Sequence, residues 1–133
     1  MANENVQQEY EAFLQDVLND KKVWLLQNEE GLACQSSLEY EGVMAVLMWS
    51  NCILAEAERE GDFEFLEAEA LGLYELIFHW LPNMTDENVV CGLNWRSDDG
   101  GLEVEPGDLL EHLTLILPEE LSNAYQKRHS EES

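Results

Sequence analysis

The sequence predicts a single domain of the α+β class, in which about four helices pack on a mixed or mainly antiparallel sheet of about five to six strands. Stretches with apolar residues at helical spacing are interleaved with β-rich stretches, and hairpin signals join some of the strands, an order typical of this class. The chain has 133 residues, about the length of one domain, and 45% of them are hydrophobic. Since no repeat, low-complexity segment or linker interrupts residues 1–133, one domain accounts for the whole chain.

The first predicted element is a helix near the N-terminus. Its apolar residues recur at helical spacing and form one stripe: Val6, Tyr10, Phe13, Leu14, Val17 and Leu18. Asn3 or Asn5 is suited to cap its start, and Asn19-Asp20 ends it.

Three strands are predicted next. Lys22–Gln27 and Leu32–Ser36 form a hairpin across the turn Asn28-Glu29-Glu30-Gly31, because a four-residue loop ending in Gly suits a type I turn with a left-handed last residue. Val43–Trp49 is nearly all apolar, which indicates a central strand covered on both faces.

The middle of the chain alternates between helix and strand. Ser50 is suited to cap a short helix that stops at Gly61, and Phe63–Leu71 is interpreted as a strand in preference to a helical extension. The stripe Leu73–Leu81 then predicts a helix that Pro82 closes.

The last third begins with a strong strand over Asn88–Trp95. Its alternation predicts that Val89, Cys91, Leu93 and Trp95 face one way. After a turn at 97–101 and a short strand over Leu102–Val104, Glu105-Pro106 opens a helix that Pro118 breaks. Glu119–Gln126 is expected to be a turn or short helix, and Lys127–Ser133 to be frayed.

Acidity is the strongest compositional signal. The chain has 29 Asp and Glu residues against 6 Lys and Arg residues, for a formal net charge of −23. Direct binding to nucleic acid is excluded because phosphates need a basic surface, and anionic membranes are disfavoured for the same reason. Residues 1–10 are polar and acidic, so we expect no signal peptide, and no apolar run comes near the ~20 residues of a membrane span. Three widely spaced cysteines, Cys34, Cys52 and Cys91, favour a reduced, cytoplasmic protein.

Motifs for catalysis or for a metal are absent from the sequence. It has no nucleophile elbow, phosphate loop or dinucleotide fingerprint, and the cysteines and His79, His112 and His129 lack metal-ligand spacing. Asp98-Asp99-Gly100 lacks the donor pattern of a calcium loop. His79 is a candidate general base, but a partly exposed helix histidine is the simpler interpretation. We therefore expect no enzyme, no metal and no cofactor.

An acidic stretch in the middle of the chain is a candidate partner-binding surface. Seven carboxylates crowd fourteen positions against Arg59 alone: Glu56, Glu58, Glu60, Asp62, Glu64, Glu67 and Glu69. A solvated face that keeps the protein soluble is one interpretation. Docking of a basic protein is the other, because clustered charge steers a cationic partner.

Tryptophans mark a second candidate region, where strand ends meet. Trp49, Asn94 and Trp95 are candidates for an aromatic-lined ligand pocket or a self-association interface, although tryptophans at such positions also serve as core. Arg96 follows them and either clamps a carboxylate or relieves acidic repulsion at the surface.

An ordered set of short motifs resembles one bacterial family. The set is Val23-Trp24-x-Leu26 with Gly31, Leu47-x-Trp49-Ser50, Trp80-Leu81-Pro82, Gly92-x-Asn94-Trp95, and Gly101-Leu102-Glu103-Val104 with Asp108-Leu109-Leu110. It resembles the family catalogued as domain of unknown function 2750 over about Glu9 to Leu113, with a weaker likeness to the N-terminal domain of SseB-type proteins. Met48 and Gly72 depart from the family pattern, which often has Pro and a capping Ser there, and residues 118–133 are an extension. The resemblance implies a compact α+β domain in the bacterial cytoplasm and implies no mechanism.

These observations favour a non-enzymatic binding protein. We expect its acidic surface to engage a basic protein, as an immunity protein against a cationic toxin or a mimic of nucleic-acid charge does. The alternative is a small-molecule-binding or regulatory module that forms a homodimer and uses the tryptophan region.

Overall fold

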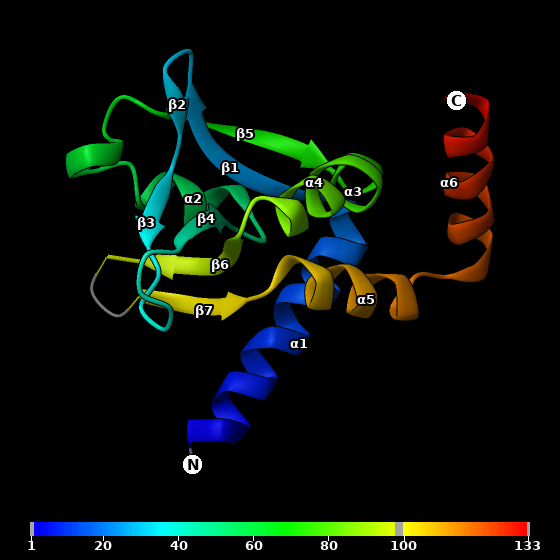
Figure 1. The fold of residues 1–133 in the computed structure, drawn as a ribbon, viewed down its shortest axis with the longest axis horizontal. Helices are drawn as coiled ribbons and strands as arrows, with labels where there is room; N and C mark the ends of the chain where they lie inside the picture. The colour runs from blue at the N-terminus through cyan, green and yellow to red at the C-terminus, as the bar shows by residue number, and fades with distance from the viewer. Residues whose placement is uncertain (1, 98–99, 133) are drawn as a thin grey trace.

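A computed structural model of the chain describes residues 2–97 and 100–132, with side chains from Gln7 onward. Asp98 and Asp99, in the turn predicted at 97–101, lie outside the described residues, as does Ser133 at the end predicted to be frayed. The described strands form two sheets (Figure 1). The α+β class with mainly antiparallel pairing is confirmed, but the strands are divided between two sheets where one was expected.

The first sheet has three antiparallel strands in the order β2-β1-β5: β1 (Lys22–Asn28), β2 (Gly31–Leu32) and β5 (Glu67–Gly72). The second has four strands in the order β3-β4-β6-β7: β3 (Cys34–Ser36), β4 (Met44–Met48), β6 (Val89–Arg96) and β7 (Gly100–Val104). Only the β4–β6 pair is parallel among the strand pairs described in this sheet.

Ala33 is the point at which the chain passes from the first sheet to the second. Its amide donates to the Leu26 carbonyl at 2.8 Å, and its carbonyl accepts from the Leu47 amide at 3.2 Å. The strand expected over Leu32–Ser36 is therefore split into β2 and β3. A second link joins the sheets where Trp24 and Trp49 exchange backbone hydrogen bonds of 2.8 and 2.9 Å.

Helices flank these sheets. They are α1 (Ala2–Asp20), α2 (Cys52–Ala57), the 3₁₀ turn η1 (Gly61–Phe63), α3 (Leu73–Glu75), the π turn η2 (Leu76–Trp80), α4 (Leu81–Asp86), α5 (Pro106–Ile116) and α6 (Glu119–Glu132). Pro106 opens α5 and Asp20 ends α1, as predicted.

Helix starts differ from the prediction at two places. Helix α1 begins at Ala2, so Asn3 and Asn5 lie inside it and do not cap it. Helix α2 is capped by Asn51 and not by Ser50, because Asn51 is extended and its side chain accepts from the Leu54 amide at 2.9 Å. Ser50 is instead fully buried.

The boundaries between Phe63 and Pro82 also differ. Strand β5 starts only at Glu67, because Gly61, at φ 57°, begins the 3₁₀ turn that turns Phe63 inward. Pro82 does not close its helix: α3, η2 and α4 run on to Asp86. The π turn interrupts the regular hydrogen-bond ladder, and Pro82, which has no amide hydrogen to donate, sits in the first turn after it.

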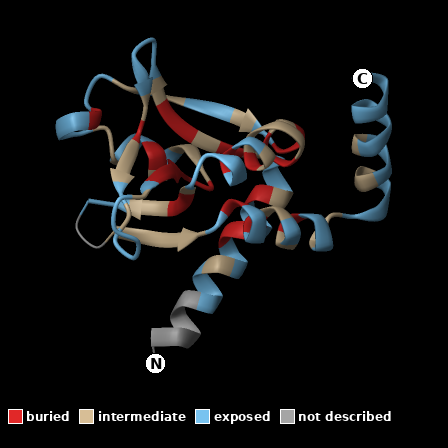
Figure 2. Ribbon diagram, viewed as in Figure 1, coloured by how far each residue is buried: buried red, intermediate tan, exposed pale blue. Residues whose placement is uncertain are grey.

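The core lies on both faces of β4, which confirms the predicted central strand (Figure 2). Val46 and Met48 belong to a cluster with α1, α3, α4 and α5. Ala45 and Leu47 belong to a second cluster with Trp49, Ala55 and Phe63. Alternation along β4 thus separates two apolar layers.

Helix α6 packs against aromatic side chains of α3 and η2, although none of its own residues is buried. Tyr125 lies edge-on to Tyr74 at 5.4 Å, and His129 stacks on Phe78 at 4.8 Å. Arg128 lies 3.9 Å from the centre of the Tyr74 ring. The end predicted to be frayed over Lys127–Ser133 is therefore helical through Glu132.

Candidate functional site

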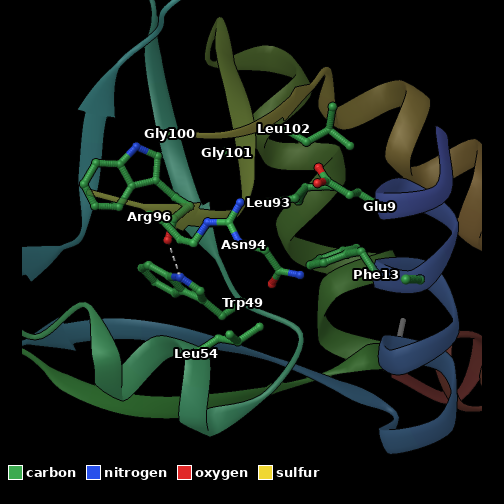
Figure 3. Close-up of a pocket in the computed structure, with 12 residues that line it drawn as sticks. Glu9, Phe13, Trp49, Leu54, Leu93, Asn94, Arg96, Gly100, Gly101 and Leu102 are labelled. Atoms are coloured by element: carbon green, nitrogen blue, oxygen red, sulfur yellow. Dashed lines mark hydrogen bonds between the residues drawn. The ribbon is translucent and has the colours of Figure 1, made fainter. Parts of the chain in front are cut away.

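A pocket of about 400 Å³ opens between α1, α2, β6 and β7 (Figure 3). All four residues of the predicted tryptophan region line it: Trp49, Asn94, Trp95 and Arg96. The other lining residues are Glu9, Ala12, Phe13, Leu54, Leu93, Gly100, Gly101 and Leu102. Its volume lies within the ~300–1,000 Å³ typical of small-molecule sites.

A β-bulge at Asn94 shapes the pocket. The pairing of β6 with β7 shifts register between Leu93 and Arg96, and Asn94 has a φ of 50°. Because the bulge adds a residue, Trp95 packs with Val90 in the second cluster, while Leu93 stays in the first. The prediction that Trp95 shares a face with Leu93 is therefore wrong, since strict alternation ends at the bulge.

The Asn94 side chain joins β6 to the end of β4. Its Oδ1 accepts from the Ser50 amide at 2.8 Å, and its Nδ2 donates to the Ser50 hydroxyl at 3.3 Å. That hydroxyl donates to Asp16 of α1 at 3.1 Å. These bonds satisfy the polar groups of a fully buried serine and tie three elements together at the pocket.

The two pocket tryptophans are joined directly. The Trp49 indole Nε1 donates to the Trp95 carbonyl at 2.8 Å (Figure 3). Trp49 is 1% exposed, and the Trp95 ring lies edge-on to Phe63 at 5.8 Å. Trp49 therefore belongs to the core and also forms one wall of the pocket.

Gly101 lets β7 approach β6 beside the bulge. A Cβ at this position would lie 2.8 Å from the Leu93 carbonyl oxygen and 2.8 Å from the Trp95 Cα. Both atoms belong to the backbone and have little room to move. Glycine is therefore required at position 101, where β6 and β7 lie close together beside the pocket.

Charged groups reach the pocket from two sides. Glu9 comes from α1 and Arg96 from the end of β6, while Phe13, Leu54 and Leu102 provide apolar surface. Figure 3 shows the Glu9 carboxylate and the Arg96 guanidinium directed into the space between α1 and β6. The arrangement can hold a small ligand that combines opposite charges with an apolar group.

The predicted acidic stretch has several different surroundings. Glu58 accepts from the Ser97 amide at 2.8 Å, and Glu56 pairs with Arg59 at 2.8 Å. Arg59 also donates to the Leu66 carbonyl at 2.7 Å. Glu60, Asp62 and Glu64 are exposed on and around η1.

Glu67 and Glu69 form part of a concave surface that the sequence did not reveal. We call it the Phe65 surface, and it consists of Gln27, Asn28, Glu29, Glu30, Phe65, Glu67 and Glu69. The register of β1 and β5 places Glu67 opposite Gln27, next to the hairpin turn. Phe65 is 79% exposed, so an aromatic ring stands in solvent among four carboxylates.

The histidines have partners in the structure. The Tyr10 hydroxyl lies 2.6 Å from His112 Nδ1, where α1 meets α5. Burial, and then the Asp108 carboxylate, raise the pKa of Tyr10 to about 12, so its hydroxyl keeps its proton at neutral pH. His79 Nε2 lies 3.4 Å from a Glu132 carboxylate oxygen on α6. Among residues 2–97 and 100–132, no group of three or more His, Cys, Asp or Glu residues could hold a metal ion.

The comparison with protein families agrees with the resemblance noted from the motifs. The model described as "Protein of unknown function (DUF2750)" matches residues 10–113. The chain belongs to the DUF2750 family. No curated protein and no solved structure matches the chain. The DUF2750 match includes every lining residue of the pocket except Glu9, whereas α6 lies beyond it.

Sequence reasoning missed the pocket residues outside the tryptophan region. Glu9 and Phe13 lie far from Trp95 in the chain, and only the packing of α1 brings them together. The pair Gly100-Gly101 did carry a signal, because glycine within a strand marks a bulge or a close backbone approach.

Of the described helices, none is long and apolar enough to cross a membrane.

Proposed function

We propose that this DUF2750 protein is a non-enzymatic protein of the bacterial cytoplasm whose acidic surface engages a basic protein. The observation that carries the proposal is the Phe65 surface, where Glu29, Glu30, Glu67 and Glu69 line the same concave surface as an aromatic residue that is 79% exposed. Such a surface matches a partner that offers Lys or Arg side chains around an apolar group.

Hydrogen bonds hold the backbone around the Phe65 surface in place. The Asn28 side chain accepts from the amides of Glu30 and Gly31 at 2.8 and 3.1 Å, which holds the hairpin turn. Gln27 donates to Glu69 across the β1–β5 pair. Preorganised carboxylates lose less conformational entropy on binding, and the net charge of −23 accelerates encounter with a cationic partner.

The test is a pull-down from a lysate of the source organism with two variants of equal charge. The surface variant carries Glu29→Gln, Glu30→Gln, Glu67→Gln and Glu69→Gln, and the control carries Asp86→Asn, Glu87→Gln, Glu119→Gln and Glu120→Gln. Each variant neutralises four exposed carboxylates and changes the formal charge from −23 to −19. The two variants therefore differ only in where charge is lost.

The expected result is a stoichiometric basic protein that binds the wild type and the control, is lost from the surface variant, and elutes at high salt. Capture that is unchanged in the surface variant, or equal loss in both variants, would show that the Phe65 surface is not the binding site. Recovery of the bait alone would contradict the proposal.

Small-molecule binding is a second candidate function, and the pocket favours it. Four residues singled out from the sequence, Trp49, Asn94, Trp95 and Arg96, line the same pocket of about 400 Å³. The pocket uses none of the side chains of the Phe65 surface, so the two candidates are compatible.

A further inference from the structure

We propose that the pocket between α1, α2, β6 and β7 binds a free α-amino acid with an apolar side chain, as its zwitterion. The inference rests on the second candidate function and names its ligand class. It depends on two properties of the pocket and one of the whole molecule. The pocket has one basic and one acidic side chain at different walls, with apolar residues between them, and the molecule has a large negative net charge.

Arg96 is suited to bind the ligand carboxylate. It is the only Lys or Arg between Glu60 and Gln126, and it lines the pocket. The bulge at Asn94 brings it there, next to a main chain held by the Asn94–Ser50 hydrogen bonds. A guanidinium offers two parallel donors to a carboxylate, which gives the strongest and most directional contact in the pocket.

Glu9 is suited to bind the ligand ammonium. Helix α1 carries it to the wall opposite the β6 strand, and its carboxylate is directed into the pocket (Figure 3). Helix α1 is held in place by the burial of Phe13 and Val17 and by the hydrogen bond that the Ser50 hydroxyl donates to Asp16. Glu9 and Arg96 therefore reach the same space from two packed elements.

The net charge separates a zwitterion from other ligands. A protein with a net charge of −23 repels ligands that carry a net negative charge, such as a simple carboxylate. A zwitterion has no net charge, and it places its positive group beside Glu9 and its negative group beside Arg96. An amine without a carboxylate would leave Arg96 without a matching group in the ligand.

Apolar surface selects the side chain of the amino acid. Phe13, Leu54, Leu93, Leu102 and Trp49 line the pocket, and Leu54 and Leu102 are the partly exposed residues among them. An apolar side chain against these residues gains free energy in proportion to the apolar area that it removes from water. A charged side chain would lose hydration there without a partner.

The experiment compares four probes on the purified wild-type chain by calorimetry and by the indole N–H signals of the tryptophans in NMR spectra. L-leucine has both charged groups, 4-methylpentanoate lacks the ammonium, 3-methylbutylamine lacks the carboxylate, and indole has no charge. We expect L-leucine to bind at least about tenfold more tightly than either single-charge analogue, since each analogue lacks one of the two charged hydrogen-bonding groups. Binding should shift the Trp49 indole signal, identified with a Trp49→Phe variant.

Two pairs of variants locate the contacts. Arg96→Gln and Glu9→Gln should each weaken L-leucine binding about tenfold or more. The controls Arg128→Gln, on α6, and Glu11→Gln, on the exposed side of α1, should not change it. The ligand series on the wild type does not depend on the folding of any variant.

The outcomes separate this inference from the second candidate function. Equal binding of L-leucine and either single-charge analogue would overturn the zwitterion and leave a ligand pocket. Indole binding without L-leucine binding would do the same. If no probe shifts the Trp49 signal at millimolar concentration, both the inference and small-molecule binding in this pocket are contradicted.

Discussion

Asn94 links the bulge in β6 to the end of β4 at the pocket. It adopts a left-handed conformation with a φ of 50°, and its side chain accepts from the amide of the fully buried Ser50. Asparagine tolerates this conformation better than most residues do, and here its amide also satisfies a buried donor. The type of residue and the backbone geometry thus support each other.

Replacement of Asn94 should separate these two effects. Asn94→Ala loses both side-chain hydrogen bonds to Ser50, at about 1–3 kcal/mol, and adds backbone strain of order 1 kcal/mol. Asn94→Gly loses the same two bonds without the strain, so it should be about 1 kcal/mol more stable than Asn94→Ala. Urea unfolding of the two variants measures the difference. An alanine variant as stable as the glycine variant would show that the left-handed conformation costs nothing here.

Cys91 predicts a loss of stability at alkaline pH. Burial raises the pKa of this thiol from 9.0 to about 12 in the folded chain. Because of this raised pKa, the protonated Cys91 thiol makes its full contribution to the free energy of unfolding below pH 9. That contribution is lost as the pH rises towards 12, because the thiol ionises at a lower pH in the unfolded chain than in the folded chain. Between these values the free energy of unfolding should fall by up to about 1.4 kcal/mol per pH unit.

A Cys91→Ala variant checks this prediction. Its free energy of unfolding at pH 7 gives the packing cost of the smaller side chain. The slope of its free energy of unfolding against pH, above pH 9, shows how much of the alkaline loss is due to ionisation of the thiol. We expect the slope to be shallower than in the wild type. An unchanged slope would assign the alkaline loss to other groups, such as Tyr10, whose pKa burial also raises to about 12.

At the scale of elements, the β6–β7 pair determines the shape of the pocket. Gly101→Ala would place a Cβ 2.8 Å from the Leu93 carbonyl oxygen and the Trp95 Cα. We expect a loss of about 1–3 kcal/mol in the free energy of unfolding, because backbone must move to make room. Gly107→Ala in α5 is the matched control: nothing lies within 4 Å of its Cβ, and alanine favours helix by up to about 1 kcal/mol.

Denaturant unfolding of both glycine variants tests this pair. A Gly101→Ala chain as stable as the wild type would mean that β7 can move away from the bulge without cost. The NMR signal of the Trp49 indole then reports whether the pocket has changed, since that indole donates to the Trp95 carbonyl.

Helix α6 is expected to detach before the rest of the chain unfolds. None of its residues is buried, and Tyr125 is one of the residues that attach it, through ring contacts with Tyr74 and Phe78 at 5.4 and 6.4 Å. Tyr125→Ala should remove these contacts, each of which contributes about 0.5–1.5 kcal/mol, and should leave the sheets intact. Hydrogen exchange checks this, with protection lost in α6 and kept in β4 and β6. The exposed Asn123, replaced by Ala, is the control, and loss of protection in β4 would contradict independent opening.

At the scale of the whole molecule, net charge opposes folding. With −23 on 133 residues, repulsion between carboxylates destabilises the compact state. Screening lengths fall from about 30 Å at 0.01 M salt to about 3 Å at 1 M. We expect sodium chloride to stabilise the chain by about 1 kcal/mol over this range, which raises Tm by roughly 4 °C.

Thermal unfolding at pH 7 and at pH 5 tests the role of charge. At pH 5 the chain is closer to its isoelectric point of about 4.1, so the stabilising effect of salt should be smaller. An equal gain at both pH values would indicate that salt acts on apolar hydration instead.

Local patterns in the sequence predicted most elements. The stripes of α1 and α5, Pro106 at the start of α5 and the apolar β4 were all predicted because they depend on neighbours three or four residues away or on simple alternation. The errors occurred where distant contacts decide the geometry. Asn51 caps α2 because Ser50 is drawn into bonds with Asn94 and Asp16, and Trp95 changes face because the β6–β7 pair has a bulge.

The amino-acid sequence was enough to predict the α+β class, the acidity, the DUF2750 resemblance and four residues of one pocket. Each of these depends on composition, on short-range periodicity or on motifs that occur in order along the chain. Three features depend on tertiary contacts instead: the strands form two sheets joined at Ala33, Glu9 lines the same pocket as Arg96, and Phe65 lines the same concave surface as Glu29, Glu30, Glu67 and Glu69. The physical reason is that such neighbours are set by backbone pairing and core packing between distant segments, which no local pattern records.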